Sequence, residues 1–352
     1  MTDRLWTSTP TMGRRTLLSG AGAAGLALGW GGPAWGLSAT PRQRIIIDND
    51  LSGDPDGLFQ LAHHLASPSC DVRLVVGSHL HDPEPFDHSA TQADNAAAKA
   101  REIIALMKLP RRPKVLAGAN KAPDFAHPAP TPATAAIIAE AMRDDTTLPL
   151  YYCAGAGLTE LAMAWKLEPR IGKRLKLVWI GGPEHNELNP TLPVRTDPEY
   201  NLTIDAEAVR ILFNQSDIEI WQIPRDAYRQ MLISHAELRA GLAGAGRLGR
   251  YLTASLDRII AMVAKAPPPH NMGIGETYIL GDSPLVTATA LQSSFEPDAS
   301  SSAYVIKPTP MVDAKGFYTP NPGGRPMRVF TRIDTRLTFS DMFAKLTEAA
   351  AR

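Results

Sequence analysis

The feature that most constrains the fold is a regular alternation of short apolar runs with stretches of helical length, from residue 44 to about residue 224. The apolar runs are continuous, which is typical of strands buried on both faces of a parallel sheet. They lie at residues 44–48, 72–77, 114–118, 148–155, 175–182 and 218–224. Helices are predicted between them, at 56–66, 92–108, 133–143, 158–167 and 205–214. We therefore expect an α/β fold in which helices cover both faces of a mostly parallel, Rossmann-like open sheet.

The C-terminal part of the chain has a mainly helical pattern. It predicts helices at 235–243, 246–265 and 282–292, two late strands at 302–307 and 328–333, and a closing helix at 339–351. The Pro-rich stretch 266–273 is expected to be a loop, because apolar patterning resumes directly after it. We therefore predict that residues 40–352 form one domain.

Charge and composition exclude several classes of protein. The chain has 36 Lys and Arg against 36 Asp and Glu, so no global excess of positive charge attracts nucleic acid or anionic membranes. An apolar content of 44% is normal for a globular protein and argues against extensive disorder. Two cysteines allow at most one disulfide bridge.

The N-terminal segment differs in composition from the rest of the chain. Arg14 and Arg15 precede residues 16–40, which carry no charge and are rich in Ala, Gly and Leu. This pattern resembles a twin-arginine export signal. A transmembrane anchor fits less well, because the apolar stretch is short and contains several glycines. We expect residues 1–39 to be removed, leaving a slightly acidic periplasmic or secreted protein with no stable membrane anchor.

An unusually acidic turn follows the first predicted strand. It places Asp48, Asp50, Asp54 and Asp56 within nine residues. Carboxylates at this density repel one another unless a cation neutralises them or some take up protons. Oxygen ligands suit a hard ion such as Ca²⁺ or Mg²⁺. The alternative is a solvated turn in which Asp56 caps the next helix.

The same turn carries a resemblance to a known family. The segment IIIDNDLSGDPDGLFQLA resembles the opening motif D-x-D-P-G-x-D-D-A of the nucleoside hydrolases. Further similar segments follow in the family's order, and they are VVGSH at 75–79, the asparagine-led helix near 95–106, AGAGLTELAMA at 154–164, LVWIGG followed by EYNLTIDAEAVRILF at 199–213, and GDSPLVTATAL at 281–291. The resemblance covers almost the whole chain after the export segment, so it implies the fold of this family.

The resemblance also implies a reaction and a set of site residues. The family hydrolyses the N-glycosidic bond of ribonucleosides with a Ca²⁺-bound water that an aspartate activates. Carried over residue by residue, this makes Asp50 the base and a metal ligand. Further metal ligands are Thr159, through its carbonyl, and Asp282. The residues expected to bind the sugar are Asp56, Glu199, Asn201 and Asn189, with Asn186 as an alternative to the last.

Two departures from the family pattern affect this chemistry. The acidic turn is one residue longer, and Gly57 stands where the second aspartate of the D-D pair normally binds calcium. We expect Asp54 or Asp56 to supply the missing metal ligand. Gly281 stands where many members have a histidine that protonates the leaving base. Candidate replacement acids are His270, Tyr278 and His185.

The sequence is also compatible with two other functions. A degenerate member of the family would bind a nucleoside or sugar without cleaving it, which Gly57 and Gly281 favour. An apolar strand followed by D-x-D, with Ser52 two residues on, also resembles the opening of the haloacid dehalogenases, which transfer phosphoryl groups. The expected partner in the leading interpretation is a small nucleoside or glycoside, and the family's habit of forming dimers or tetramers makes a homo-oligomer possible.

Overall fold

The computed structural model describes residues 40–265, 275–293 and 301–352. The predicted export segment and the candidate acid His270 lie outside these described residues. Among the described residues, no helix has the length and apolarity needed to cross a membrane. Cys70 and Cys153 are free thiols.

An eight-stranded sheet forms the centre of the structure. Its strand order is β3-β2-β1-β4-β5-β6-β12-β9, and all neighbouring pairs are parallel except β12 and β9. The strands are β1 (Gln43–Asn49), β2 (Cys70–Gly77), β3 (Lys114–Ala117), β4 (Leu150–Ala154), β5 (Lys176–Ile180), β6 (Glu219–Ile223), β9 (Ala303–Pro308) and β12 (Pro326–Arg332). This confirms the predicted α/β fold with a mostly parallel sheet.

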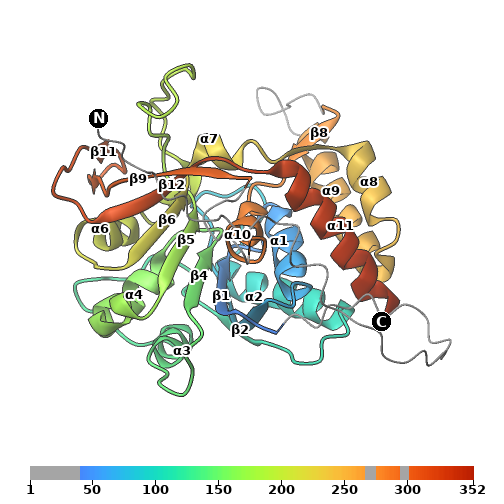
Figure 1. Cartoon of the computed structure of the whole chain (residues 1–352), viewed down its shortest axis with the longest axis horizontal. Helices are drawn as coiled ribbons and strands as arrows, with labels where there is room; N and C mark the ends of the chain where they lie inside the picture. Colours follow the sequence, from blue (N-terminus) through green and yellow to red (C-terminus); the bar gives the residue numbers. More distant parts are fainter. Residues whose placement is uncertain (1–39, 266–274, 294–300) are drawn as a thin grey trace, which may run out of the picture. The chain divides into compact units, whose positions relative to one another are not determined.

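Helices cover both faces of this sheet (Figure 1). On one side lie α3 (Pro132–Ala141), α4 (Thr159–Leu167) and α6 (Ala206–Asn214). On the other side lie α1 (Asp56–Leu65), α2 (Gln92–Leu106), α8 (His235–Leu242), α9 (Gly246–Lys265), α10 (Pro284–Thr289) and α11 (Thr335–Ala351). In β1, Ile45 and Ile47 pack into the apolar cluster of one face and Ile46 into that of the other. Burial on both faces explains why this strand is a continuous apolar run.

Several short elements were not predicted from the sequence. They are α5 (Tyr200–Ile204), α7 (Arg225–Tyr228), the 3₁₀ helix Pro169–Lys173, the pair β7 (Leu232–Ser234) and β8 (Thr277–Ile279), and the pair β10 (Met311–Val312) and β11 (Tyr318–Thr319). Each has at most five residues, too few for an apolar periodicity to show.

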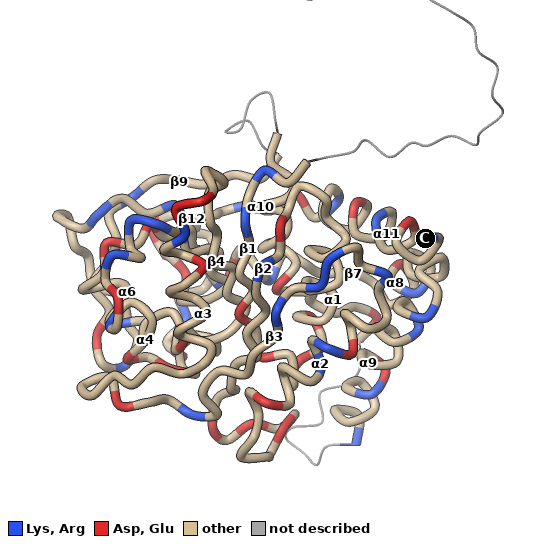
Figure 2. Tube along the Cα trace, turned by 90° about the horizontal axis from the view of Figure 1, so that it is seen from below, with Lys and Arg blue, Asp and Glu red and all other residues tan. Residues whose placement is uncertain are grey.

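The charged side chains do not separate into a positive and a negative face. Figure 2 shows Lys and Arg interspersed with Asp and Glu along the described trace. This distribution agrees with the balanced composition and gives no broad basic surface for a nucleic-acid backbone in this view.

The strand order reverses between β1 and β4. From β1 the chain proceeds through β2 to β3 on one side, whereas β4 leads to β5 and β6 on the other. Hydrogen bonds join the strand ends at this point, since Gly155 N donates to Asp48 O (2.9 Å) and Ser78 N donates to Asn49 O (3.0 Å). In open α/β sheets such a reversal leaves a crevice at the carboxyl ends of the strands, where ligands bind.

Gly77 allows β2 to approach α2 closely. A Cβ atom at this position would lie 2.6 Å from Ala93 O and press against Ala97 N, and these backbone atoms have no rotamer by which to move away. We expect Gly77→Ala to lower the free energy of unfolding by about 1–3 kcal/mol or more, because it overpacks this contact. Urea unfolding measures the change. Gly323→Ala is the matched control, since the nearest heavy atom to its added Cβ is 4.0 Å away. Equal losses in the two variants would contradict the close packing.

Candidate active site

A pocket of about 210 Å³ lies at this crevice. Its aspartates come from the turn after β1 and from the segment before α10. The rest of its lining comes from the loops after β2 and β4, the end of β5, and α5 with its N-cap Glu199 and α7. It is lined by Asp50, Asp54, Asp56, Leu80, Phe86, Gly155, Ile180, Glu199, Tyr200, Asn201, Tyr228, Gly281 and Asp282. The structure thus brings together six of the predicted site residues.

The acidic residues are joined by backbone hydrogen bonds. Asp56 Oδ1 accepts from Gly57 N (2.8 Å), and Asp56 Oδ2 accepts from Asp282 N (3.2 Å). Asp54 Oδ1 accepts from Asp56 N (3.2 Å) and from the phenol of Tyr278. The N-cap position of α1 is Pro55, so Asp56 is the first helical residue rather than the cap. These bonds hold Asp56 beside Asp282 and Asp54 beside Asp56, and the role of either as the ligand that Gly57 lacks stays a prediction.

Burial dominates the electrostatics of these carboxylates. It raises the pKa of Asp50, Asp54 and Asp56 above the ordinary value, and neighbouring carboxylates raise each of them further. Burial likewise raises the pKa of Asp282 to about 7, against a hydrogen bond from Asn49 that lowers it. Four carboxyl groups in such surroundings do not all ionise at neutral pH unless a cation compensates their charge.

A cation site built from these residues needs more than acidic side chains. Within the described ranges, no three His, Cys, Asp or Glu side chains converge as a ready metal cage. A cation at this pocket could also take amide or backbone carbonyl oxygens as ligands. Calcium accepts both kinds of ligand.

The opposite wall of the pocket presents groups suited to sugar hydroxyls. Glu199 is the N-cap of α5, and its Oε2 accepts from Gly182 N (2.7 Å) and Leu202 N (3.0 Å). Its Oε1 accepts from the Tyr228 phenol (2.8 Å). Asn201 is held by a hydrogen bond from Nδ2 to Ile180 O (2.8 Å). These contacts fix both side chains, so they line the pocket without needing to reorganise.

The sequence analysis missed two polar side chains, one that lines the pocket and one that contacts its lining. Tyr228 comes from the short helix α7, which has no periodic pattern. Glu84 is buried, accepts from the Tyr200 phenol, and its charge contributes to the raised pKa of Asp50. The sequence signal for Glu84 is the polar loop at residues 79–88, which directly follows an apolar strand.

Four of the predicted residues do not line the pocket, namely Thr159, Asn189, His185 and Tyr278. Thr159 donates its hydroxyl to Asp205 Oδ2 (2.7 Å), and Asn189 Oδ1 accepts from the Thr191 hydroxyl (2.9 Å). Neither lines the pocket, so their roles as metal ligand and ribose ligand stay predictions. His185 also lies outside the pocket lining and is buried.

His185 is unsuited to protonate a leaving base. Its ring is buried away from the pocket between Gln222 Oε1 (2.9 Å from Nε2) and Lys307 Nζ (2.7 Å from Nδ1). Burial lowers the pKa of His185 to about 4, and the nearby lysine charge lowers it further. The imidazole is therefore neutral and already bonded at both nitrogens. Tyr278 is closer, one hydrogen bond from the pocket through Asp54.

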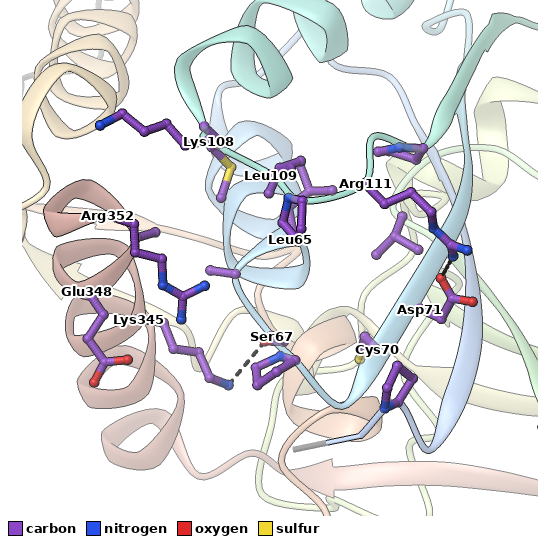
Figure 3. Close-up of a pocket in the computed structure, with 18 residues that line it drawn as sticks. Leu65, Ser67, Cys70, Asp71, Lys108, Leu109, Arg111, Lys345, Glu348 and Arg352 are labelled. Carbon is purple, nitrogen blue, oxygen red and sulfur yellow. Dashed lines mark hydrogen bonds and ion pairs between the residues drawn. The ribbon is translucent and has the colours of Figure 1, made fainter. Parts of the chain in front are cut away.

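A larger cavity lies at the other edge of the sheet. It has a volume of about 360 Å³ and lies where β2 begins and α1 and α11 end. Figure 3 shows Lys108, Lys345, Arg352 and Cys70 around it, with Lys345 Nζ donating to Ser67 Oγ (3.1 Å). The strand ends at this edge are amino ends, so it is not where an open parallel sheet binds its ligand.

Comparison with known proteins now identifies the family. The sequence profile of the inosine-uridine preferring nucleoside hydrolases matches residues 45–338. The chain belongs to this family. Its membership sets aside the resemblance to haloacid dehalogenases.

Two curated nucleoside hydrolases match a short part of the chain. The inosine-uridine preferring nucleoside hydrolase of Crithidia fasciculata is 45% identical over 67 residues, which is 19% of each chain. That of Leishmania major is 47% identical over 60 residues, covering 17% of this chain and 18% of the relative. The aligned stretches thus span about a fifth of the length of these relatives.

Solved nucleoside hydrolase structures share the fold over nearly their full length. The Bacillus anthracis inosine-uridine preferring enzyme aligns with a TM-score of 0.60 and 19% identity, covering 87% of this chain and 99% of the other. The Gardnerella vaginalis purine-preferring ribonucleoside hydrolase aligns with a TM-score of 0.58 and 19% identity, covering 88% and 99%. At this identity the likeness shows a common fold.

In this chain, both glycines that depart from the family pattern lie close to the acidic residues. A Cβ on Gly281 would lie 3.2 Å from Asp56 Oδ2, and a Cβ on Gly57 would lie 2.7 Å from Asn49 Oδ1. Other side chains therefore occupy the space into which residues 57 and 281 would project.

The buried aspartate behind the pocket makes stability depend on pH. Asp48 accepts from the Ser78 hydroxyl and the Tyr152 phenol, and burial raises its pKa from 3.8 to about 7. Between these values the folded state binds a proton that the unfolded chain has released, so the free energy of unfolding falls as pH rises. In Asp48→Asn this titration is absent, so we expect the free energy of unfolding to fall less steeply with pH, by up to about 1.4 kcal/mol per pH unit.

Urea unfolding of both proteins at pH 4.5, 5.5 and 6.5 in metal-free buffer measures this difference. The stability of the wild-type protein relative to Asp48→Asn should decrease across the series. Parallel pH profiles would show that Asp48 is not protonated in the folded state.

Proposed function

We propose that this protein hydrolyses the N-glycosidic bond of a ribonucleoside with the help of a divalent cation, Ca²⁺ being the expected ion. One observation carries the proposal. Buried carboxylates line one pocket together with fixed acceptors and donors for sugar hydroxyls, at the strand reversal of a nucleoside hydrolase fold. The names of the related enzymes, which act on inosine, uridine or purine ribonucleosides, support this substrate class.

The donor set of the pocket fits a hard cation. Asp50 and Asp282 are the proposed carboxylate ligands, because burial makes the shared negative charge of the acidic residues costly without a counter-ion. When bound, Ca²⁺ would bind sugar hydroxyls and polarise the attacking water. The nucleoside hydrolase family is generally metal-dependent, which agrees with these oxygen ligands.

Asp50 is the proposed general base. It lies directly after β1, and burial, together with the charges of Asp282, Glu84 and Asp54, raises its pKa. A raised pKa makes the ionised form a stronger proton acceptor, and a base whose pKa lies close to the working pH is the most effective. Asp50 would take the proton of the water that attacks the anomeric carbon.

The sugar side of the pocket holds the ribose in place. Asp56 and Glu199 offer carboxylate oxygens, and Asn201 and Tyr228 offer amide and phenol groups. Because Glu199 is fixed by Gly182 and Leu202, it holds the sugar without loss of side-chain freedom on binding. Such positioning brings the anomeric carbon toward the base.

The leaving base meets phenols rather than a histidine. Tyr200 and Tyr228 line the pocket, and Tyr278 bonds to Asp54. Burial raises the pKa of all three above the ordinary value, so they remain protonated and can donate hydrogen bonds. Each phenol donates its single proton to a carboxylate, Glu84, Glu199 or Asp54, so donation to the departing base requires that this hydrogen bond be exchanged.

A second candidate function is binding of a nucleoside or sugar without cleavage. Gly57 removes a usual metal ligand and Gly281 a usual acid, which favours this alternative. Release of ribose from a panel of purine and pyrimidine ribonucleosides, with Ca²⁺ or with chelator, separates the two. Calcium-dependent release supports hydrolysis, whereas calorimetric binding without release supports the alternative and contradicts the proposal.

The acidic residues provide the corresponding mutational test. Asp50→Asn and Asp282→Asn keep side-chain size, and we expect each to lower kcat/KM by about 10² or more, because they remove the base or a metal ligand. Asp124→Asn is the matched control, since Asp124 is exposed and pairs only locally with His127. Full activity in both pocket variants, with ribose release otherwise observed, would show that the site is elsewhere.

A further inference from the structure

We propose that Asn49 supplies, through Oδ1, the cation ligand that Gly57 no longer provides. The proposal rests on the proposed function, because it concerns the same cation site. In this proposal, the amide oxygen of Asn49 in β1 takes the place of the carboxylate that the family usually has at residue 57 in α1.

The first support is an unpaired oxygen. Asn49 is completely buried, and its Nδ2 donates to Asp282 Oδ2 (2.7 Å) and Gln60 Oε1 (3.2 Å). Within the described part of the chain, its Oδ1 has no hydrogen-bond partner. A buried carbonyl oxygen without a partner costs about 1–3 kcal/mol, so its retention beside Asp282 indicates that something else binds it.

The second support is the space that two glycines leave for this amide. A Cβ on Gly57 would lie 2.7 Å from Asn49 Oδ1, 2.9 Å from Nδ2 and 3.0 Å from Cγ, so the amide group of Asn49 occupies the space into which a side chain at residue 57 would extend. A Cβ on Gly155 would lie 2.5 Å from Asn49 Nδ2 and 2.6 Å from Asp282 Oδ2. Both glycines are needed for Asn49 to reach Asp282, and Gly155 and Asp282 line the pocket.

The third support is a buried hydrogen-bond chain that sets the direction of the amide. The Thr289 hydroxyl donates to Leu285 O (2.6 Å), so its oxygen is free to accept from His64 Nε2 (2.9 Å). His64 Nδ1 then has no proton and accepts from Gln60 Nε2. Gln60 Oε1 consequently faces Asn49 Nδ2, which leaves Asn49 Oδ1 as the free acceptor.

This order of donors requires a neutral imidazole. Burial lowers the pKa of His64 to about 3, with smaller effects from His63 and Lys345. A protonated ring would donate from both nitrogens and would turn the amides of Gln60 and Asn49 around. The buried chain therefore leaves Asn49 Oδ1 as a free oxygen beside Gly57 at neutral pH, while Nδ2 of the same amide bonds to Asp282, which lines the pocket.

An amide oxygen suits the electrostatics of this pocket. It is a hard, neutral ligand of the type that Ca²⁺ accepts alongside carboxylates. Replacing a carboxylate by an amide removes one negative charge from a pocket whose acidic groups already raise one another's pKa. We therefore expect a site with fewer acidic ligands that keeps the same number of protein oxygens.

Luminescence of bound Eu³⁺, a hard ion that substitutes for Ca²⁺, tests the ligand directly. Decay rates in H₂O and D₂O report how many water molecules remain on the ion, and a lost protein ligand is replaced by about one water. We expect Asn49→Ala to show about one more bound water than the wild-type protein, and to need roughly tenfold more Ca²⁺ to displace Eu³⁺. Asn214→Ala is the matched control, because Asn214 is a partly buried asparagine that bonds at both amide ends to Val312 (2.9 and 2.8 Å).

The exchange also predicts a rescue. Asn49→Ala together with Gly57→Asp should restore the wild-type number of waters, since a carboxylate at residue 57 then occupies the freed space. The double variant tests the proposal even where Asn49→Ala folds poorly, and a double variant with the extra water overturns it. An unchanged water number in Asn49→Ala overturns the role of Asn49 and leaves the proposed function standing. Failure of the wild-type protein to bind Eu³⁺ or Ca²⁺ overturns both.

Discussion

Repulsion among buried carboxylates is the constraint on which the site depends. Asp50, Asp54, Asp56 and Asp282 lie around one pocket, and burial raises the pKa of each. Such a group is costly to fold unless protons or a cation balance its charge. Its persistence at a ligand-binding crevice indicates a functional site rather than a structural one.

The sheet makes this concentration of charge possible. The strand order reverses at β1 and β4, and the hydrogen bonds Gly155 N to Asp48 O and Ser78 N to Asn49 O tie the strand ends together there. The apolar residues of β1 are buried on both faces, so the turn that follows has a rigid base. A rigid base is what allows carboxylates to be held close despite their repulsion.

The sequence predicted the parts of the structure that have long patterns. The six apolar runs up to residue 224 all became strands of the central sheet, and the acidic turn after the first of them became one wall of the pocket. Short elements carried no such pattern, which is why α5 and α7 were missed, and with them the bond from Tyr228 to Glu199. The sequence could not show that His185 is unavailable as an acid, because its burial and its bond to Gln222 arise from tertiary packing.

The importance of Asn49 also depends on three-dimensional contacts. In the sequence it is only the middle residue of D-N-D, whereas in the structure it links β1 to Asp282, 233 residues later. Gln60 and His64 look like ordinary residues of an amphipathic helix, yet their hydrogen bonds determine which end of the amide is free. The apolar periodicity of a helix predicts which of its residues are buried, but it does not predict which groups donate and which accept in their hydrogen bonds.

The most direct test of the central claim is a crystal structure with Ca²⁺ and a ribonucleoside analogue that cannot be cleaved. We expect anomalous scattering to locate one cation in contact with Asp50 and Asp282, and the sugar hydroxyls between that ion and the side chains of Glu199 and Asn201. An analogue bound in the pocket with no cation between Asp50 and Asp282, or a cation bound elsewhere on the chain, would contradict the claim.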